Sequence, residues 1–163
     1  MRLQIPLVGE FEVVCAYADG IMAWHERFKN GMTLEGLTDL LSAGFAGGTQ
    51  RSWRVGLIGS AGFDAVDLSD TALTHAGWQE FQGYSESTRP ALGSATVAAA
   101  VARAAPVSFT LNQDATVRGL FVISESTKGG TSGVLWCTGL FSSPRDLLAG
   151  QTLTTRYTLR AGG

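Results

Sequence analysis

Apolar and polar residues alternate along the first part of the chain, from residue 2 to residue 30. A period of two is typical of a β-strand that buries one face, because successive side chains of a strand point to opposite sides. Asp19 and Gly20 interrupt this alternation. An Asp-Gly pair between two such runs predicts a tight β-hairpin, since both residues tolerate positive φ. The runs that we expect to form strands are residues 2–8, 10–18 and 21–30, with Gly9 between the first two.

The stretch "MTLEGLTDLLSAGF", residues 32–45, changes the period of the hydrophobic pattern. Its leucines recur at spacings that place them on one face of an α-helix. Thr33 is expected to cap the start and Gly44 the end, which predicts one short α-helix near residues 33–43. Such a short helix is marginal alone, so we expect its leucine face to pack against a sheet. The leucines of this face are Leu34, Leu37, Leu40 and Leu41.

Short strand-like runs separated by turn residues fill the rest of the chain. Regular spacing of such runs, with almost no helix between them, is typical of an antiparallel β-sandwich or barrel rather than a parallel sheet. The length of 163 residues suits one domain, and we expect residues 1–163 to form a single, mainly β domain. The expected strands are residues 52–59, 78–91, 95–103, 106–111, 116–124, 133–141 and 151–160.

The charge of the chain argues against a polynucleotide partner. Residues 1–80 carry five Lys and Arg against ten Asp and Glu, and residues 81–163 carry seven against four. Nucleic-acid binding by counterion release needs cations clustered on one face. The arginines of the second half instead occur singly, so we expect no nucleic-acid partner. They are Arg89, Arg103, Arg118, Arg145, Arg156 and Arg160.

The two cysteines, Cys15 and Cys137, lie in apolar stretches and are expected to be small buried hydrophobic residues. A secreted domain held together by disulfides would use more of them, so the sequence favours a reducing cytosol. "MRLQIPLVGEFEV" does not resemble a signal peptide, and no apolar stretch has the length of a membrane span. We therefore expect no membrane association.

The familiar catalytic and metal-binding motifs are incomplete in this sequence. His25 and His75 have no neighbouring ligand residues at metal-binding spacing, so no metal site is predicted. Ser60 in "IGSAG" lacks the first glycine of a nucleophile elbow. In "STKGGTSG", residues 126–133, Lys128 precedes the glycines, whereas the lysine of a phosphate-binding loop follows them. We predict no cofactor and no catalytic residue from these motifs.

The stretch "WQEFQGYSESTRPAL", residues 78–92, has the highest density of functional groups in the chain. Glu80 and Glu86 form a candidate carboxylate pair for glycoside hydrolysis. On an extended strand, however, carboxylates at this separation lie about 20 Å apart, which is too far for one site unless Gly83 bends the chain. The alternative is a polar segment that enters a sheet edge, with Arg89 held extended before Pro90 and free to pair with Glu86 or a neighbouring subunit.

The order of these features resembles a family of small structural proteins encoded by tailed bacteriophages. The resemblance runs from about Val13 to Leu159 and is carried by "DGIMAWHERFKNGMTLEGLTDLLSAGF", "SWRVGLIG", "THAGWQEFQGYSESTRPAL", "VSFTLNQDATVRGLFVIS" and "GGTSGVLWCTGLFSSPRDLLAGQTLTTRYTLRAGG". Its most specific pieces are Asn30-Gly31, the segment from Trp78 to Arg89, and Gly150 followed by a strand. In such proteins that last strand often reads "GDxLxVxY". Here Gln151 replaces the acidic residue and Thr155 the valine.

The resemblance implies a non-enzymatic virion component with a β-sandwich or jelly-roll-like fold. Such proteins commonly decorate or cement the capsid as trimers, so the expected partners are other copies of the chain, as a homotrimer, and the major capsid protein. The expected location is the virion, assembled in the cytoplasm of the bacterial host. The alternatives are a tail or fibre component that binds a host receptor or glycan, and a carbohydrate-active enzyme that uses Glu80 or Glu86. The candidate interface residues are Trp24, Trp78, Tyr84, Glu86 and Arg89.

Overall fold

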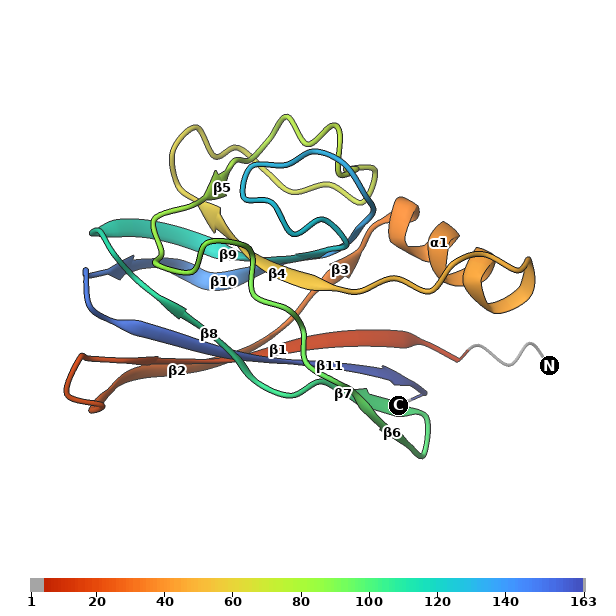
Figure 1. The fold of residues 1–163 in the computed structure, drawn as a ribbon, viewed down its shortest axis with the longest axis horizontal. Coiled ribbons are helices and arrows are strands. Elements are labelled where there is room, and N and C mark those ends of the chain that lie inside the picture. The colour runs from red at the N-terminus through yellow and green to blue at the C-terminus, as the bar shows by residue number, and fades with distance from the viewer. Residues whose placement is uncertain (1–4, 163) are drawn as a thin grey trace.

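Two antiparallel β-sheets face each other in the structure, a computed structural model that describes residues 5–162 (Figure 1). This arrangement confirms the mainly β fold and is the antiparallel β-sandwich that the turn spacing predicts. The strands of the first sheet are β1 (Leu7–Ala16), β2 (Met22–Lys29), β6 (Thr96–Ala98), β7 (Val101–Arg103), β8 (Val107–Thr110) and β11 (Thr152–Ala161). Their order is β2-β1-β11-β7-β6, and β8 pairs with β11 beside β7.

The second sheet and the helix complete the sandwich. Its strands are β3 (Gly31–Met32), β4 (Arg54–Gly59), β5 (Glu80–Phe81), β9 (Ala115–Ile123) and β10 (Leu135–Leu147), in the order β3-β10-β9-β4-β5. The helix α1 (Leu34–Phe45) joins β3 to β4 and lies at one end of the molecule (Figure 1). At 12 residues, α1 is much shorter than a membrane span, and residues 5–162 form no other helix.

The main core lies between the two sheets, and the inward-facing residues of the alternating strands form it. β1 and β11 pair along their whole lengths, from Leu7 opposite Ala161 to Ala16 opposite Thr152. Alternate residues of both strands point inward and are buried, including Phe11, Val13 and Cys15. Burial raises the pKa of Cys15 to about 11 and that of Cys137 to about 12, as expected for free thiols inside a core.

A second, smaller core lies on the other face of the second sheet. The loops that follow β4 and β9 cover this face, and they enclose Ile58, Trp78, Phe121, Ile123 and Leu135. Because β4 and β9 are covered on both faces, most of their residues are buried. The upper loops in Figure 1 are therefore a packed layer over the sheet.

The hairpin prediction is confirmed, and two predicted strand boundaries need correction. The Tyr17 amide donates to the Ile21 carbonyl, and Gly20 has a φ of +85°. β1 runs straight through Gly9, so the two expected strands 2–8 and 10–18 are one; residues 2–4 lie outside the described residues. The expected strand 95–103 is also divided, because Ala99 and Ala100 adopt positive φ and form the turn between β6 and β7.

The helix forms where the sequence predicts it, but its packing prediction is wrong. Thr33 caps the start by accepting a hydrogen bond from the Gly36 amide at 2.9 Å, and the helix continues through Gly44 to Phe45. Gly36 is the only buried residue of the helix. A Cβ at this position would lie 2.6 Å from the Trp136 carbonyl oxygen, so glycine is what allows the close approach. The leucines expected against the sheet are mostly exposed: Leu34 at 61%, Leu40 at 42% and Leu41 at 60%.

Candidate functional site

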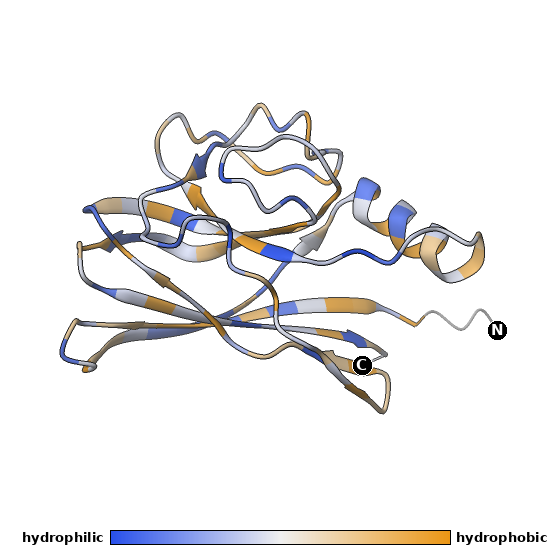
Figure 2. Ribbon diagram, viewed as in Figure 1, coloured by the Kyte–Doolittle hydropathy of each residue, from blue (hydrophilic) through white to orange (hydrophobic). Residues whose placement is uncertain are grey.

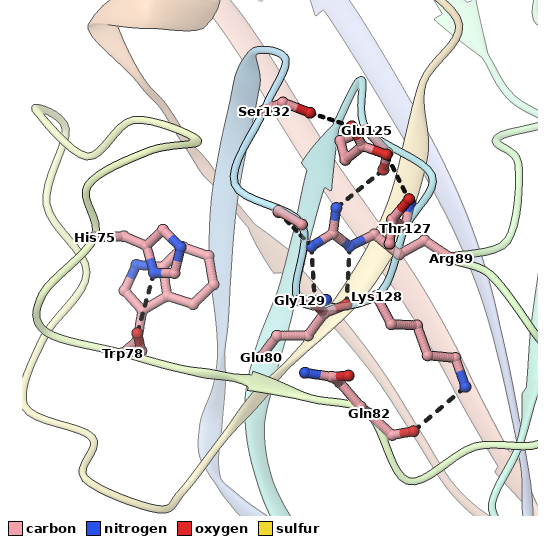
Figure 3. Close-up of polar contacts among 11 residues, drawn as sticks. His75, Trp78, Glu80, Gln82, Arg89, Glu125, Thr127, Lys128, Gly129 and Ser132 are labelled. Carbon is pink, nitrogen blue, oxygen red and sulfur yellow. Dashed lines mark hydrogen bonds and ion pairs between the residues drawn. The ribbon is translucent and has the colours of Figure 1, made fainter.

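The polar segment 78–91 does not form the expected strand. Glu80 and Phe81 pair with β4, and the segment makes two isolated bridges, from Ala91 to Arg54 of β4 and from Tyr84 to Leu111. The rest of the segment crosses the edge of the second sheet and passes beneath the loop 124–134, where Arg89 enters the interior (Figure 3). Polar side chains in this segment bond to the backbone of neighbouring loops, and these bonds take the place of a regular strand ladder.

A buried ion pair between Arg89 and Glu80 forms the centre of this region. Arg89 Nε donates to one carboxylate oxygen of Glu80 at 2.9 Å, and Nη2 donates to the other at 2.8 Å. The same guanidinium donates to the carbonyls of Glu125 and Gly130, each at 3.0 Å (Figure 3). The two side chains are only 3% and 5% exposed. This bidentate geometry is the strong form of an ion pair, and it ties the loop 124–134 to β5.

The loop 124–134 is also closed by its own hydrogen bonds. Glu125 accepts from the Ser132 hydroxyl and from the Thr127 amide, and these bonds lower the pKa of Glu125 to about 2, with the Ser132 bond contributing most. The Gly129 amide, at a φ of +69°, donates to Glu80. The glycines that resemble a phosphate loop therefore allow this turn to fold onto the Glu80 carboxylate.

Lys128 of this loop is held against Tyr84. Its ammonium donates to the Tyr84 carbonyl at 2.7 Å and lies 3.8 Å from the centre of the phenol ring. Burial raises the pKa of Tyr84 above its usual value, so the ring stays neutral and attracts the cation through its face. The lysine thus adds a second link between the loop 124–134 and the segment 78–91.

A small cavity of about 170 Å³ lies beside the ion pair, next to the stacked rings of His75 and Trp78. The ring centroids are 4.0 Å apart, and Trp78 Nε1 donates to Asp70 at 2.9 Å. Among the residues that line the cavity, Glu80 and Arg89 already bond to each other. Figure 3 shows both groups pointing into the loop layer, and their geometry is that of a structural cluster that holds the layer in place.

The structure separates the five residues predicted to form an interface. Trp78, Tyr84 and Arg89 are 2%, 1% and 2% exposed, so their expected place on a contact surface is corrected to the interior. Glu86 accepts from the Thr110 amide and is not paired with Arg89. Trp24 is half-buried, with Phe141 at 5.5 Å and the Arg145 guanidinium over its ring. Sequence spacing did not reveal that the segment folds inward, because Glu80 and Arg89 meet only through the bend between them.

The two histidines also have local partners, and Ser60 lies in a turn. His25 contacts Glu12 at 3.3 Å on the outer face of the first sheet, and His75 contacts the Trp78 carbonyl at 3.1 Å. Ser60 lies in the turn after β4, where its carbonyl accepts from the Phe63 amide. Within residues 5–162, no three His, Cys, Asp or Glu side chains are grouped as metal ligands would be.

Exposed apolar side chains gather at one end of the sandwich, which we name the hairpin end. It consists of the β1–β2 turn and the β10–β11 turn, which lie side by side with Ala18 next to Gly150. Tyr17, Ile21 and Met22 in the first turn and Leu148 in the second are 47%, 63%, 61% and 51% exposed. Their shared position makes a projecting apolar tip (left in Figure 1).

The opposite end, which we name the helix end, contains a groove of about 710 Å³ between the two sheets. Its apolar walls include Trp53, Trp136, Leu92 and Leu159, and α1 borders it through Leu40, Ala43 and Gly44. Phe45, at the end of the same helix, is 89% exposed. Figure 2 shows the C-terminal turns of α1 coloured as hydrophobic. Of the four leucines predicted to share one helical face, only Leu40 lines this groove, and Leu34 and Leu41 are exposed outside it.

Comparisons of this chain with models of protein families, with curated proteins and with solved structures find no match.

Proposed function

We propose that this protein is a structural component of a tailed-bacteriophage virion that acts by binding protein surfaces. The observation that carries the proposal is the pair of exposed apolar ends on a rigid β-sandwich. Contiguous exposed apolar groups are a feature of surfaces that contact other proteins. The resemblance of the sequence to small virion proteins supplies the context in which such contacts would be made.

The specific role that we propose is decoration or cementing of the capsid. In this role the chain binds the major capsid protein and other copies of itself, and the contacts stabilise the shell. The tightly tied loop layer over the second sheet supports such a role, because a rigid surface loses little conformational entropy on binding. The fold by itself assigns no role, since a β-sandwich serves many functions.

The copy number of the protein in purified virions tests the proposal. Quantitative mass spectrometry is expected to find hundreds of copies per particle, and immunogold electron microscopy is expected to label the head. About a dozen copies, with label on the tail, would instead support the alternative of a tail or fibre component. Purified virions that lack the protein would exclude both roles.

The glycosidase alternative is less well supported by the site geometry. Glu80 is bonded to Arg89 and Gly129, and Glu86 to the Thr110 amide. Glycoside hydrolysis needs two carboxyl groups that face one another across the scissile bond. Both carboxylates here are engaged in holding loops and strands together.

A further inference from the structure

We propose that the hairpin end of one copy docks into the groove at the helix end of the next copy. The inference deepens the self-association in the proposed function and rests on it. It assigns the two surfaces that meet and makes the contact heterologous, because each copy contributes a different surface.

The shapes and polarity of the two ends are complementary. The hairpin end projects, and its tip carries Tyr17, Ile21 and Met22. The helix end is hollow, and its groove of about 710 Å³ is lined on both sides by tryptophan, leucine and alanine side chains. Apolar anchors that enter a concave apolar site supply most of the free energy at protein interfaces.

The charges of the two ends are also complementary. The three adjacent turns at the hairpin end, residues 17–21, 111–114 and 148–151, contain Asp19 and Asp114 and no Lys or Arg. Both aspartates are exposed. At the helix end, Arg54 lines the groove and forms no ion pair with any residue between 5 and 162. A contact between copies would bring these aspartates toward an unpaired guanidinium and would steer the approach.

The position of the two ends favours a second copy of this chain as the occupant. They lie at opposite extremes of the long axis in Figure 1, so docking at one end leaves the other end free. Each added copy therefore offers the same two surfaces again. The assembly grows as an open chain, or closes into a ring if successive copies are rotated enough for the ends to meet.

Two blocking variants test the contact with the full chain. Ile21→Arg places a charge on the hairpin tip, where the native side chain is 63% exposed. Gly44→Arg fills the groove from α1, and a Cβ at this position has no atom within 4 Å, so folding is not disturbed. Leu73→Arg is the matched control, because Leu73 is 72% exposed in the loop between β4 and β5 and belongs neither to the groove lining nor to the turns of the hairpin end.

Sedimentation velocity is measured at protein concentrations from about 10 μM to about 1 mM, the range in which proteins with small interfaces associate. The wild type and the Leu73→Arg control are expected to increase in mass with concentration, and 0.5 M NaCl is expected to weaken this association. Each blocking variant alone is expected to lose at least about tenfold in affinity. An equimolar mixture of Ile21→Arg and Gly44→Arg is expected to form a dimer that stops at two copies, since one intact end of each kind remains.

The mixture also distinguishes a head-to-tail contact from other contacts between copies. A monomeric wild type at every concentration, or association that neither blocking variant weakens, overturns the head-to-tail contact. A mixture that stays monomeric while the wild type associates overturns it as well, because one intact hairpin end and one intact groove would then not suffice for the contact. If virions still contain hundreds of copies in any of these cases, the proposed function stands and another protein occupies the groove. If the mixture dimerises but virions lack the protein, the contact stands and the virion role is excluded.

Discussion

Replacement of Arg89 by methionine should remove most of the connection between the loop 124–134 and the second sheet. Methionine keeps the length of the side chain but has no donors. The Glu80 carboxylate, 5% exposed, would keep the Gly129 amide as a partner and lose its cation. The carbonyls of Glu125 and Gly130 would lose their donor as well.

The expected magnitude follows from the burial of the pair. Removal of one partner of a buried, hydrogen-bonded ion pair costs about 3–5 kcal/mol, because the remaining charge is left uncompensated. For a chain of 163 residues this corresponds to a fall in Tm of about 6–20 °C. Whole domains are stable by only about 5–15 kcal/mol, so the variant would be close to unfolding.

Urea unfolding at pH 7, followed by tryptophan fluorescence, measures this effect, since Trp78 and Trp136 are both buried. The double variant Glu80→Gln and Arg89→Met is expected to be more stable than Arg89→Met alone, because no buried charge remains. Arg27→Met is the control: this arginine pairs with Glu12 on the surface, and its loss should leave the midpoint unchanged. A loss below about 1 kcal/mol for Arg89→Met would refute the structural role that we assign to the pair.

Three further predictions concern local geometry and pH. Gly36→Ala should destabilise the protein by about 1–3 kcal/mol in urea, because its Cβ would lie 2.6 Å from a carbonyl oxygen of the strand beneath the helix. Gly44→Ala in the same helix meets no atom within 4 Å and should be neutral or stabilising, so equal losses would contradict this account. Replacing the Ala99-Ala100 turn by Asn-Gly should raise stability by about 1–2 kcal/mol, since both alanines have positive φ; a lower urea midpoint would argue against a two-residue turn there. Glu125, with a folded pKa of about 2 against an ordinary value of 4.5, should contribute stability at neutral pH that is lost as the pH falls from about 4.5 to 2. The loss in this window should be smaller in Glu125→Gln, and an identical acid profile for that variant would contradict the contribution.

Much of the sandwich could be predicted from local pattern. The alternation in β1 and β11 is a direct result of pleating, so it identified both strands and the faces they bury. The Asp19-Gly20 turn and the Thr33 cap depend on residues adjacent in sequence, and both are found as predicted. Glycine is a weaker indicator of where a strand ends: Gly9 predicts a break between two strands, although β1 continues through it.

The packing of the helix and the course of segment 78–91 depend on contacts between distant residues. The leucines of α1 have correct helical spacing, but the side of the helix that touches β10 is set by Gly36, where two backbones can approach. Periodicity identifies an apolar face and does not say what covers it. The sequence therefore identified the apolar face of α1 but not that this face is left exposed.

By itself, the sequence determined the fold class, the hairpin, the helix and its cap, because each follows from side-chain period or from hydrogen bonds between near neighbours. Only the tertiary structure decided that Arg89 points inward to Glu80 and away from a neighbouring subunit. The reason is physical: a charged side chain can be buried only where a partner and several carbonyls converge, and that convergence requires the loop 124–134 to pack over segment 78–91. The same packing leaves the two ends of the sandwich uncovered, and these ends are where we expect the protein to meet its partners.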